Sequence, residues 1–387
     1  MKFSRAKDRK ADERSIIILT FTYIFVKILA LKKTVRKGDV MKKIISILLL
    51  LCIVVSAISL TSCTKASSGA SNSRTFYTYF DTVGTFYDYN GMKKSEFDAL
   101  ADRVEEELSI YHKLYDIYNE YDGMTNIASL NANAGKGAVK VDKKIIDLLS
   151  LSKELYSLTD GEMNIAMGAV LSIWHDCRDE ATENPDSARV PTDDELKTAA
   201  EHTDISKLII DKEAGTVELC DPGMSLDVGA IAKGYAVEKV AKLIAAEYGD
   251  GFVLDVGGNL RVIGTKPDGS GWLAGIRNPD TAALETIVYK TEIKNASLVT
   301  SGSYERFYTV GGVRYHHIIN SETLFPENYY ASVSVLTKSS ALSDALSTAL
   351  FNMEYEELRG FVDRNGGIFV VIVTTEGVVE TLGEKPT

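Results

Sequence analysis

Apolar and polar positions recur with two periods along this chain, and each period predicts a different element. Spacings of three and four predict amphipathic helices, which we expect over 95–118, 142–159, 231–248, 339–352 and 355–365. A period of two predicts strands, which we expect over 74–89 (a strand pair turning at Gly84), 208–210, 216–219, 251–255, 260–263, 272–277, 287–290, 298–300, 306–310, 331–336 and 368–374. Because the strands come in runs, the sequence predicts an α+β fold, mostly antiparallel sheets with flanking helices in a single body.

Two polar stretches interrupt this pattern. Residues 126–137 are expected to form a polar loop. Residues 176–203 are charged and contain proline, so we expect an exposed excursion from the body.

A long apolar run precedes the body and is typical of an export signal. Residues 44–60 are almost entirely apolar, follow a charged start at 41–43, and end in small residues before Cys63. This order predicts a bacterial lipoprotein signal over 41–62, with cleavage before Cys63 and a lipid on its thiol. A transmembrane anchor is the alternative, and the run is short for one.

The segments on either side of this signal have separate interpretations. A second apolar run at 16–31 is interrupted by Lys27. We expect residues 1–40 to result from a start codon assigned too early, with a membrane hairpin as the alternative. The Ser- and Ala-rich residues 63–73 predict a flexible tether, and residues 74–387 are expected to be the catalytic domain.

Charge and cysteine content exclude some classes of partner and site. The whole chain has a net charge of −11, and residues 63–387 carry 30 basic and 50 acidic residues. Such an acidic body argues against nucleic acid as a partner, and an anionic substrate would need a cation or a local positive group. Only Cys177 and Cys220 follow Cys63, with no zinc-type spacing, and one bridge between them stays open.

Residues 225–236 are the first candidate site. Asp227 ends a strand, a glycine-containing turn follows, and a helix begins, so free N–H groups and the positive end of the helix dipole could receive a phosphate. Lys233 lies in the first turn, where a cation opposes the dipole. This placement favours a bound anion, and a solvated lysine on a packing helix is the alternative.

Residues 343–350 are the second candidate site. Asp344 and Thr348 are four residues apart, so they share one helical face amid small apolar residues. A buried carboxylate needs a partner. A carboxylate, a hydroxyl, backbone carbonyls and phosphate oxygens form a ligand set that suits Mg²⁺. Asp344 could instead only complement the dipole at the helix start.

Two further segments have weaker signals. Gly257 and Gly258 permit close approach of a ligand, but a plain hairpin is the preferred interpretation because GxGxxG is absent. Small hydroxyls surround Gly302 and are typical of a phosphate or sugar pocket. His316 and His317 point to opposite faces of a strand, so only one can serve a site and a zinc pair is disfavoured. The alternative is one core and one exposed histidine.

These segments, in this order, resemble the ApbE family of FAD:protein FMN transferases, flavin-trafficking lipoproteins of the bacterial envelope. The similarity extends from about Thr75 to Glu380, and its most specific parts are DVGAIAKGYAVEKV, TSGSYERF followed by HHII, and SDALSTALF. The resemblance implies an α+β fold, FAD as donor, Mg²⁺, and transfer of FMN to a Thr or Ser hydroxyl of an acceptor protein, releasing AMP. It also implies attachment to the cell membrane by a lipid on the extracytoplasmic face, and an acceptor from an envelope electron-transfer system.

The resemblance also assigns roles to residues of this chain. It implies metal ligands at the Ala230 carbonyl, Asp344 and Thr348, with Ser347 where many relatives have an acidic residue or alanine. Contacts to the flavin dinucleotide are implied at Val83, Tyr118, Glu162, Met163, Asn164, Asp227, Lys233 and Ile319. His317 matches the usual histidine of its motif and is the expected general base, while Asp344 is the expected catalytic metal ligand.

The chain departs from the family pattern at several positions. Val83 replaces a common Met, Asn164 a common Asp, Ala166 and Ala169 a Thr and a Pro, and residues 320–324 differ from Asp-Pro-x-Thr-Gly. These changes affect contact detail more than reaction class. Two alternatives to transfer stay open, a pyrophosphatase that splits FAD into FMN and AMP, and a flavin-binding lipoprotein without catalysis.

Overall fold

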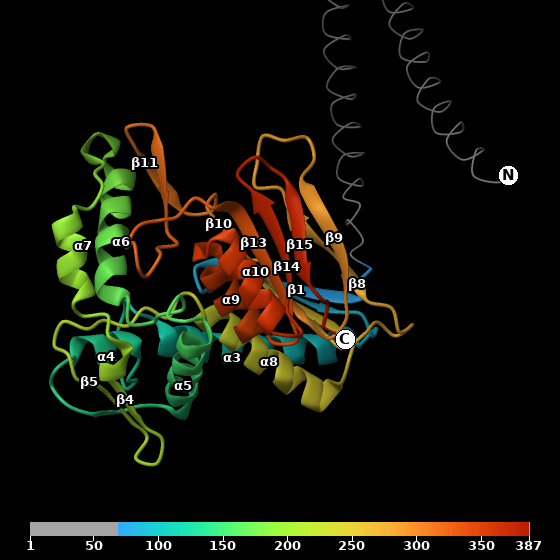
Figure 1. Ribbon diagram of the computed structural model, residues 1–387. Helices are drawn as coiled ribbons and strands as arrows, with labels where there is room; N and C mark the ends of the chain where they lie inside the picture. Colours follow the sequence, from blue (N-terminus) through green and yellow to red (C-terminus); the bar gives the residue numbers. More distant parts are fainter. Residues whose placement is uncertain (1–68, 387) are drawn as a thin grey trace, which may run out of the picture. The chain divides into compact units, whose positions relative to one another are not determined.

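The computed structural model describes residues 69–386, which combine helices with antiparallel sheets (Figure 1). This confirms the predicted α+β class. The predictions for residues 1–40, for the signal over 41–62 and for Cys63 lie outside the described residues. Among the residues described, no helix has both the length and the apolar character that crossing a membrane requires.

An eight-stranded antiparallel sheet forms the centre of the body. Its strands lie in the order β1 (Asn72–Tyr79), β2 (Thr82–Asp88), β6 (Phe252–Val256), β7 (Asn259–Ile263), β10 (Ser297–Gly302), β13 (Tyr330–Thr337), β14 (Phe369–Thr374) and β15 (Val379–Gly383). Successive side chains point to opposite faces, so the adjacent Val253 and Leu254 enter two different cores. Both faces of the sheet are therefore covered.

Helices cover one face of this sheet (Figure 1). They are α3 (Lys94–Tyr115), α8 (Ala232–Tyr248), α9 (Ser340–Asn352) and α10 (Tyr355–Arg364). Helix α9 packs on β10 and β13, α8 packs on α9, and α3 packs on α8. The ring of Phe86 stacks between those of Phe97 and Phe252, at centroid distances of 5.5 and 5.7 Å. Burial of such rings stabilises this layer.

A hairpin covers the opposite face. It consists of β8 (Trp272–Arg277) paired with β9 (Ile287–Ile293). Side chains along β8 are alternately buried and exposed. Trp272 and Ile276 pack with Val262 and Leu298 of the central sheet. The prediction of a strand over residues 272–277 is therefore confirmed, and one face of that strand is buried.

The turn between β1 and β2 differs from the prediction. The turn residues are Phe80 and Asp81, both with positive φ (55° and 52°), whereas Gly84 pairs with Phe76 inside the strand pair. A Cβ on Gly84 would lie 1.9 Å from the Phe76 ring. Gly84 is thus needed for close packing across the strands rather than for a turn.

A smaller layer adjoins the helices. It contains α4 (Ile127–Ala132), α5 (Lys143–Leu158) and a three-stranded sheet of β3 (Val139–Lys140), β5 (Thr216–Leu219) and β4 (Leu208–Asp211). The prediction of a loop over 126–137 is wrong, because Asn126 and Ser129 form a reciprocal capping box that starts α4.

A second correction concerns the predicted excursion over 176–203. This segment contains the second half of α6 (Gly168–Glu183), the short helix η1 (Pro185–Ser187) and α7 (Asp193–Ala200). Trp174 in α6 contacts the rings of Tyr315 and Phe325 at 5.9 and 5.4 Å. The helices thus pack against the hairpin of β11 (Phe307–Val310) and β12 (Val313–His316), beside them in Figure 1. A further short helix, η2 (Ile205–Lys207), precedes β4.

Candidate functional site

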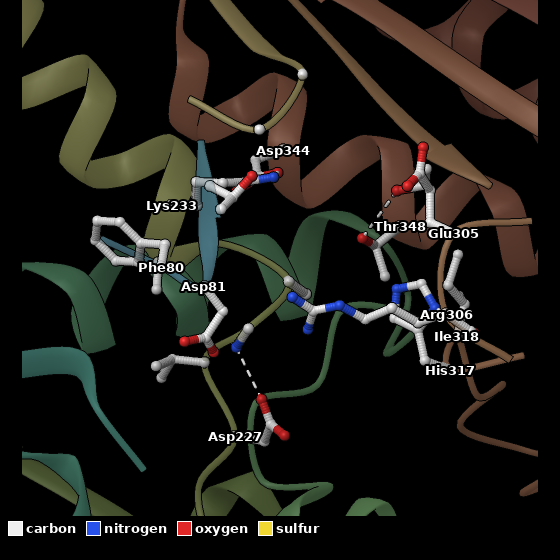
Figure 2. Close-up of a pocket in the computed structure, with 18 of the residues that line it drawn as sticks. Phe80, Asp81, Asp227, Lys233, Glu305, Arg306, His317, Ile318, Asp344 and Thr348 are labelled. Carbon is white, nitrogen blue, oxygen red and sulfur yellow. Dashed lines mark hydrogen bonds and ion pairs between the residues drawn. The ribbon is translucent and has the colours of Figure 1, made fainter. Parts of the chain in front are cut away.

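A cavity of about 1000 Å³ lies where the turn after β1, the starts of α6 and α8, helix α9 and the segments flanking the β11–β12 hairpin come together. Twelve of the residues predicted for the site line it, namely Val83, Tyr118, Glu162, Met163, Asn164, Asp227, Ala230, Lys233, His317, Ile319, Asp344 and Thr348. The volume suits a large organic ligand. Residues from distant parts of the chain therefore meet in one site (Figure 2).

Ser347 is the predicted site residue that does not line the cavity. Its side chain is fully buried, and its Oγ donates to the Asp344 carbonyl at 2.9 Å. It also lies 2.9 Å from Ser301 Oγ. Ser301 Oγ is in turn 3.3 Å from Thr348 Oγ1, so Ser347 supports the hydroxyl that faces the cavity.

The Asp344 carboxyl is held from the start of α8. Asp344 is 5% exposed, and its Oδ2 accepts a 2.7 Å hydrogen bond from the Gly234 N–H. Lys233 Nζ lies 3.7 Å from Oδ1. Burial raises the pKa of Asp344, while Lys233 and the Gly234 hydrogen bond oppose that rise. A desolvated carboxylate with one nearby cation is suited to bind a second cation.

The Asp344 carboxylate completes the start of α8. The helix begins at Ala232, so the Gly234 N–H in its first turn has no acceptor within the helix. Asp344 accepts it, and within residues 69–386 the carbonyl of Ala230, which precedes the helix, accepts no hydrogen bond. Ala230 lines the cavity. The turn therefore offers a backbone oxygen to a ligand.

These groups have the donor chemistry that a magnesium site uses. The Ala230 carbonyl, the Asp344 carboxylate and the Thr348 hydroxyl are all hard oxygen donors that line one cavity. Among the described residues, no cluster of three His, Cys, Asp or Glu side chains could hold a metal. A mixed set of one carboxylate with neutral oxygens suits Mg²⁺, which keeps waters and binds substrate phosphates.

Close packing between α8 and α9 keeps these groups together. A Cβ on Gly234 would lie 2.4 Å from Asp344 Cβ and 2.4 Å from the Ser340 carbonyl. Asn259 Nδ2 also lies close to this added Cβ. The Asn259 side chain favours the ionised form of Asp344, although its Nδ2 makes no hydrogen bond of normal geometry. Glycine is required where two helices approach this closely.

Asp227 lies on the opposite side of the cavity from Asp344 in Figure 2. Its Oδ1 accepts a 2.8 Å hydrogen bond from the Gly229 N–H, and its own N–H donates to the Ile165 carbonyl at 2.8 Å. The loop before α8 is thereby fixed at both ends. Lys233 and Asp227 thus both face the cavity, as the sequence predicted.

The two adjacent histidines have different surroundings. His316 is 2% exposed, with Nε2 bonded to the Glu327 carbonyl at 2.8 Å and Nδ1 accepting from the Ile318 N–H at 3.3 Å. His317 lines the cavity, with Nδ1 3.2 Å from the Arg306 carbonyl. Burial, then the charge of Arg306, lowers the pKa of His317 to about 3. His317 is therefore neutral near pH 7, with Nε2 free to accept a proton.

A polar corner of the cavity surrounds Glu162. Its Oε2 lies 3.5 Å from Asn320 Nδ2, which also donates to the Asn352 carbonyl at 3.2 Å. Burial raises the pKa of Glu162 to about 7, with Glu357, Glu322 and Glu327 adding to the rise. The Asn352 side chain is 3% exposed, and its Oδ1 has no partner among the described groups.

Sequence reasoning missed several residues that line the cavity. His175 lies on α6, and its Nδ1 is 3.1 Å from Tyr118 Oη. Arg178 and Arg306 add positive charge. Arg306 lies inside the TSGSYERF motif and could have been identified there, whereas the contribution of α6 had no signal because its segment was interpreted as an excursion. Cys177 and Cys220 are both free, so the bridge left open by the sequence is not formed.

Comparisons with known proteins show which family the chain resembles. Residues 82–372 match the model of the ApbE family. The FAD:protein FMN transferase of Treponema pallidum is 36% identical over 247 residues, which cover 60% of this chain and 66% of that protein. The FAD:protein FMN transferase of Haemophilus influenzae is 25% identical over 345 residues, which cover 88% of this chain and 96% of that protein.

Solved structures show the same fold. The ApbE protein of Thermotoga maritima superimposes with a TM-score of 0.70 at 25% identity, covering 80% of this chain and 96% of that one. The flavinyl transferase ApbE of Pseudomonas stutzeri gives a TM-score of 0.66 at 26% identity, covering 80% and 94%. The likeness extends over almost all of each relative's structure.

Proposed function

This chain belongs to the ApbE family, and on that premise we propose that it is a magnesium-dependent enzyme that moves FMN from FAD to a Thr or Ser hydroxyl of an acceptor protein, releasing AMP. The observation that carries the proposal is the set of hard oxygens from Ala230, Asp344 and Thr348 beside a cavity of about 1000 Å³. Such a set suits a cation that accompanies a diphosphate.

The reaction forms one P–O bond and breaks another. The acceptor hydroxyl oxygen attacks the phosphorus on the FMN side of FAD, and the bond from that phosphorus to the bridging oxygen breaks, so AMP leaves with the bridging oxygen. Mg²⁺, held by Ala230, Asp344 and Thr348, would supply positive charge to the phosphate oxygens. Lys233 lies beside Asp344 and adds charge from the protein itself.

His317 is the proposed acceptor of the hydroxyl proton. Its Nδ1–H donates to the Arg306 carbonyl, which leaves the Nε2 lone pair directed away from that contact. A pKa near 3 makes the ring a weak base in the free enzyme. A bound diphosphate would raise that pKa, because a nearby negative charge favours the protonated ring. The base would then become effective only when substrate is present.

Two substitutions of Asp344 test the metal site. Asp344→Asn keeps an oxygen that can accept the Gly234 N–H but removes the charge, whereas Asp344→Ala also releases that N–H. We expect both variants to lose FMN transfer when they are incubated with FAD, Mg²⁺ and a candidate acceptor protein. Transfer is detected by in-gel flavin fluorescence of the acceptor. Wild-type transfer by either variant at limiting Mg²⁺ would show that Asp344 does not bind the metal.

The same incubation separates the proposed transfer from its alternatives. Mass analysis of an acceptor that gains FMN, together with free AMP, supports transferase activity. Free FMN and AMP with unmodified acceptor indicates a pyrophosphatase. Intact FAD in the presence of Mg²⁺ indicates a flavin-binding protein without catalysis.

We also propose that a lipid on Cys63 anchors the enzyme on the extracytoplasmic face of the cell membrane, near an acceptor of an envelope electron-transfer system. Support comes from the apolar run over 44–60 and the small residues before Cys63. Mass spectrometry of the mature N-terminus tests this. A mature chain that begins before residue 63, or carries no lipid, contradicts it.

A further inference from the structure

The charges that line the cavity do not favour a diphosphate. The acidic lining residues are Asp81, Asp116, Glu162, Asp227, Asp255, Glu305 and Asp344, and the lysine and arginine residues are Arg178, Lys233, Arg277 and Arg306. An anionic substrate in such a cavity needs cations that are not already neutralised by a neighbour.

Three of the four basic side chains already have a carboxylate partner. Arg178 bonds Asp179 at 3.1 Å, Lys233 lies 3.7 Å from Asp344, and Arg277 lies 3.6 Å from Glu305. These contacts reduce the positive charge that each can offer to a ligand.

Arg306 differs from the other three. Within the described part of the chain, its guanidinium makes no ion pair, hydrogen bond or ring contact. In Figure 2 its side chain extends from the side of His317 into the middle of the site, between the Lys233–Asp344 pair and Asp227. An arginine that faces a ligand cavity without a carboxylate partner keeps its full capacity to bind an oxyanion.

The backbone of Arg306 is fixed although its side chain is free. Its carbonyl accepts the His317 N–H at 3.1 Å and lies 3.2 Å from His317 Nδ1. Both contacts come from one residue across the base of the hairpin. The backbone of Arg306 is therefore already ordered, and only its side chain has to be ordered when the guanidinium binds.

We propose that Arg306 is a substrate-binding residue whose guanidinium contacts a phosphate oxygen of the FAD diphosphate, opposite the oxygens that the metal site neutralises. This inference rests on the proposed function for the identity of the substrate. A planar guanidinium forms strong, directional hydrogen bonds with phosphate. It would also hold His317 and the diphosphate in one arrangement, because the two residues are joined through the Arg306 carbonyl.

Equilibrium binding without turnover tests the inference. We would titrate the full chain with FAD, and separately with riboflavin, in EDTA, following flavin fluorescence. The variants are Arg306→Ala, Arg306→Lys and, as matched control, Arg314→Ala. Arg314 belongs to the same hairpin but stacks on Phe307 at 4.1 Å and does not line the cavity.

We expect Arg306→Ala to weaken FAD binding roughly tenfold or more, the size of a charge-assisted hydrogen bond. Arg306→Lys should recover part of the loss, and Arg314→Ala should change the Kd less than about twofold. Riboflavin, which lacks phosphate, should bind Arg306→Ala and the wild type equally. Raising the salt concentration should reduce the difference for FAD.

Three outcomes would overturn the inference. FAD affinity could be unchanged in Arg306→Ala. FAD and riboflavin could weaken equally, which would assign the guanidinium to the flavin ring. FAD affinity could stay intact while transfer to an acceptor falls, which would assign Arg306 to the acceptor protein. FAD binding is measured without an acceptor, so the binding result can be interpreted whether or not the wild type transfers FMN. Absence of transfer in the wild type would contradict the proposed function alone.

Discussion

Gly234 is the position where packing and chemistry can be tested with a single methyl group. It lies in the first turn of α8, and at an open helix position Gly→Ala stabilises by about 0.5–1 kcal/mol. Here the added Cβ would lie 2.4 Å from Asp344 Cβ and from the Ser340 carbonyl. Ordinary contact requires α8 and α9 to separate by about 1 Å, and overpacking of this kind costs about 1–3 kcal/mol.

We therefore expect Gly234→Ala to destabilise the fold, opposite in sign to its helix propensity. A net loss of about 1–2 kcal/mol lowers the Tm by about 1.5–3 °C for a domain of this size, given an unfolding entropy of about 2.1 cal/mol/K per residue. The same movement displaces Asp344 from the Ala230 carbonyl. A misplacement of about 1 Å in a catalytic group can reduce the rate about 100-fold.

The measurement compares thermal unfolding and flavin-transfer rate in Gly234→Ala and Gly366→Ala. Gly366 has no positive φ, and a Cβ there would meet nothing within 4 Å. The control should keep wild-type activity and a wild-type or slightly higher Tm. Wild-type Tm and rate in Gly234→Ala would refute the reasoning, since the helices would then have room for the methyl group.

Three further predictions concern titratable side chains. Burial raises the pKa of Glu162 to about 7, so the free energy of unfolding falls as the pH rises from the unfolded pKa near 4.5 through about 7. Near pH 8 the free energy of unfolding of Glu162→Gln should exceed that of the wild type by about 1–3 kcal/mol, and this gain should shrink toward about pH 4.5. Urea unfolding at several pH values measures the difference. His316→Ala should cost about 1–3 kcal/mol in stability, because it leaves the Ile318 N–H and the Glu327 carbonyl without their partner, yet preserve transfer by the folded enzyme. His317→Ala should instead lower transfer by roughly 10²–10⁴-fold with little change in unfolding, and the reverse pattern for the two histidines would contradict their assignment.

Local patterns predicted most of the elements. The spacing of apolar residues over 95–118 and 142–159 predicted α3 and α5 to within a few residues. The four-residue spacing of Asp344 and Thr348 correctly placed both on the face of α9 that lines the cavity. In each of these cases, the determining interactions lie within one element.

Errors occurred where tertiary packing decides the structure. The charged surface of α6 and α7 indicated an exposed excursion, but Trp174 and Leu196 are buried against neighbours far away in the sequence. Gly84 was predicted to lie at a turn, whereas it lies within a strand, and a glycine is needed there because the Phe76 ring on the paired strand leaves no room for a Cβ. Neither neighbour can be identified from local periodicity.

The metal site depends on one such long-range contact. The Gly234 N–H and the Asp344 carboxylate are 110 residues apart in sequence, and their hydrogen bond orients the carboxylate at the start of α8. A motif can indicate that Ala230, Gly234 and Asp344 belong to one site. It cannot indicate that Asp344 supplies the acceptor that the Gly234 N–H lacks at the start of a helix, because this contact joins two elements far apart in the sequence. Loss of the contact would leave the Asp344 carboxylate without its hydrogen bond to α8, so the geometry of the proposed metal site depends on how α8 and α9 pack.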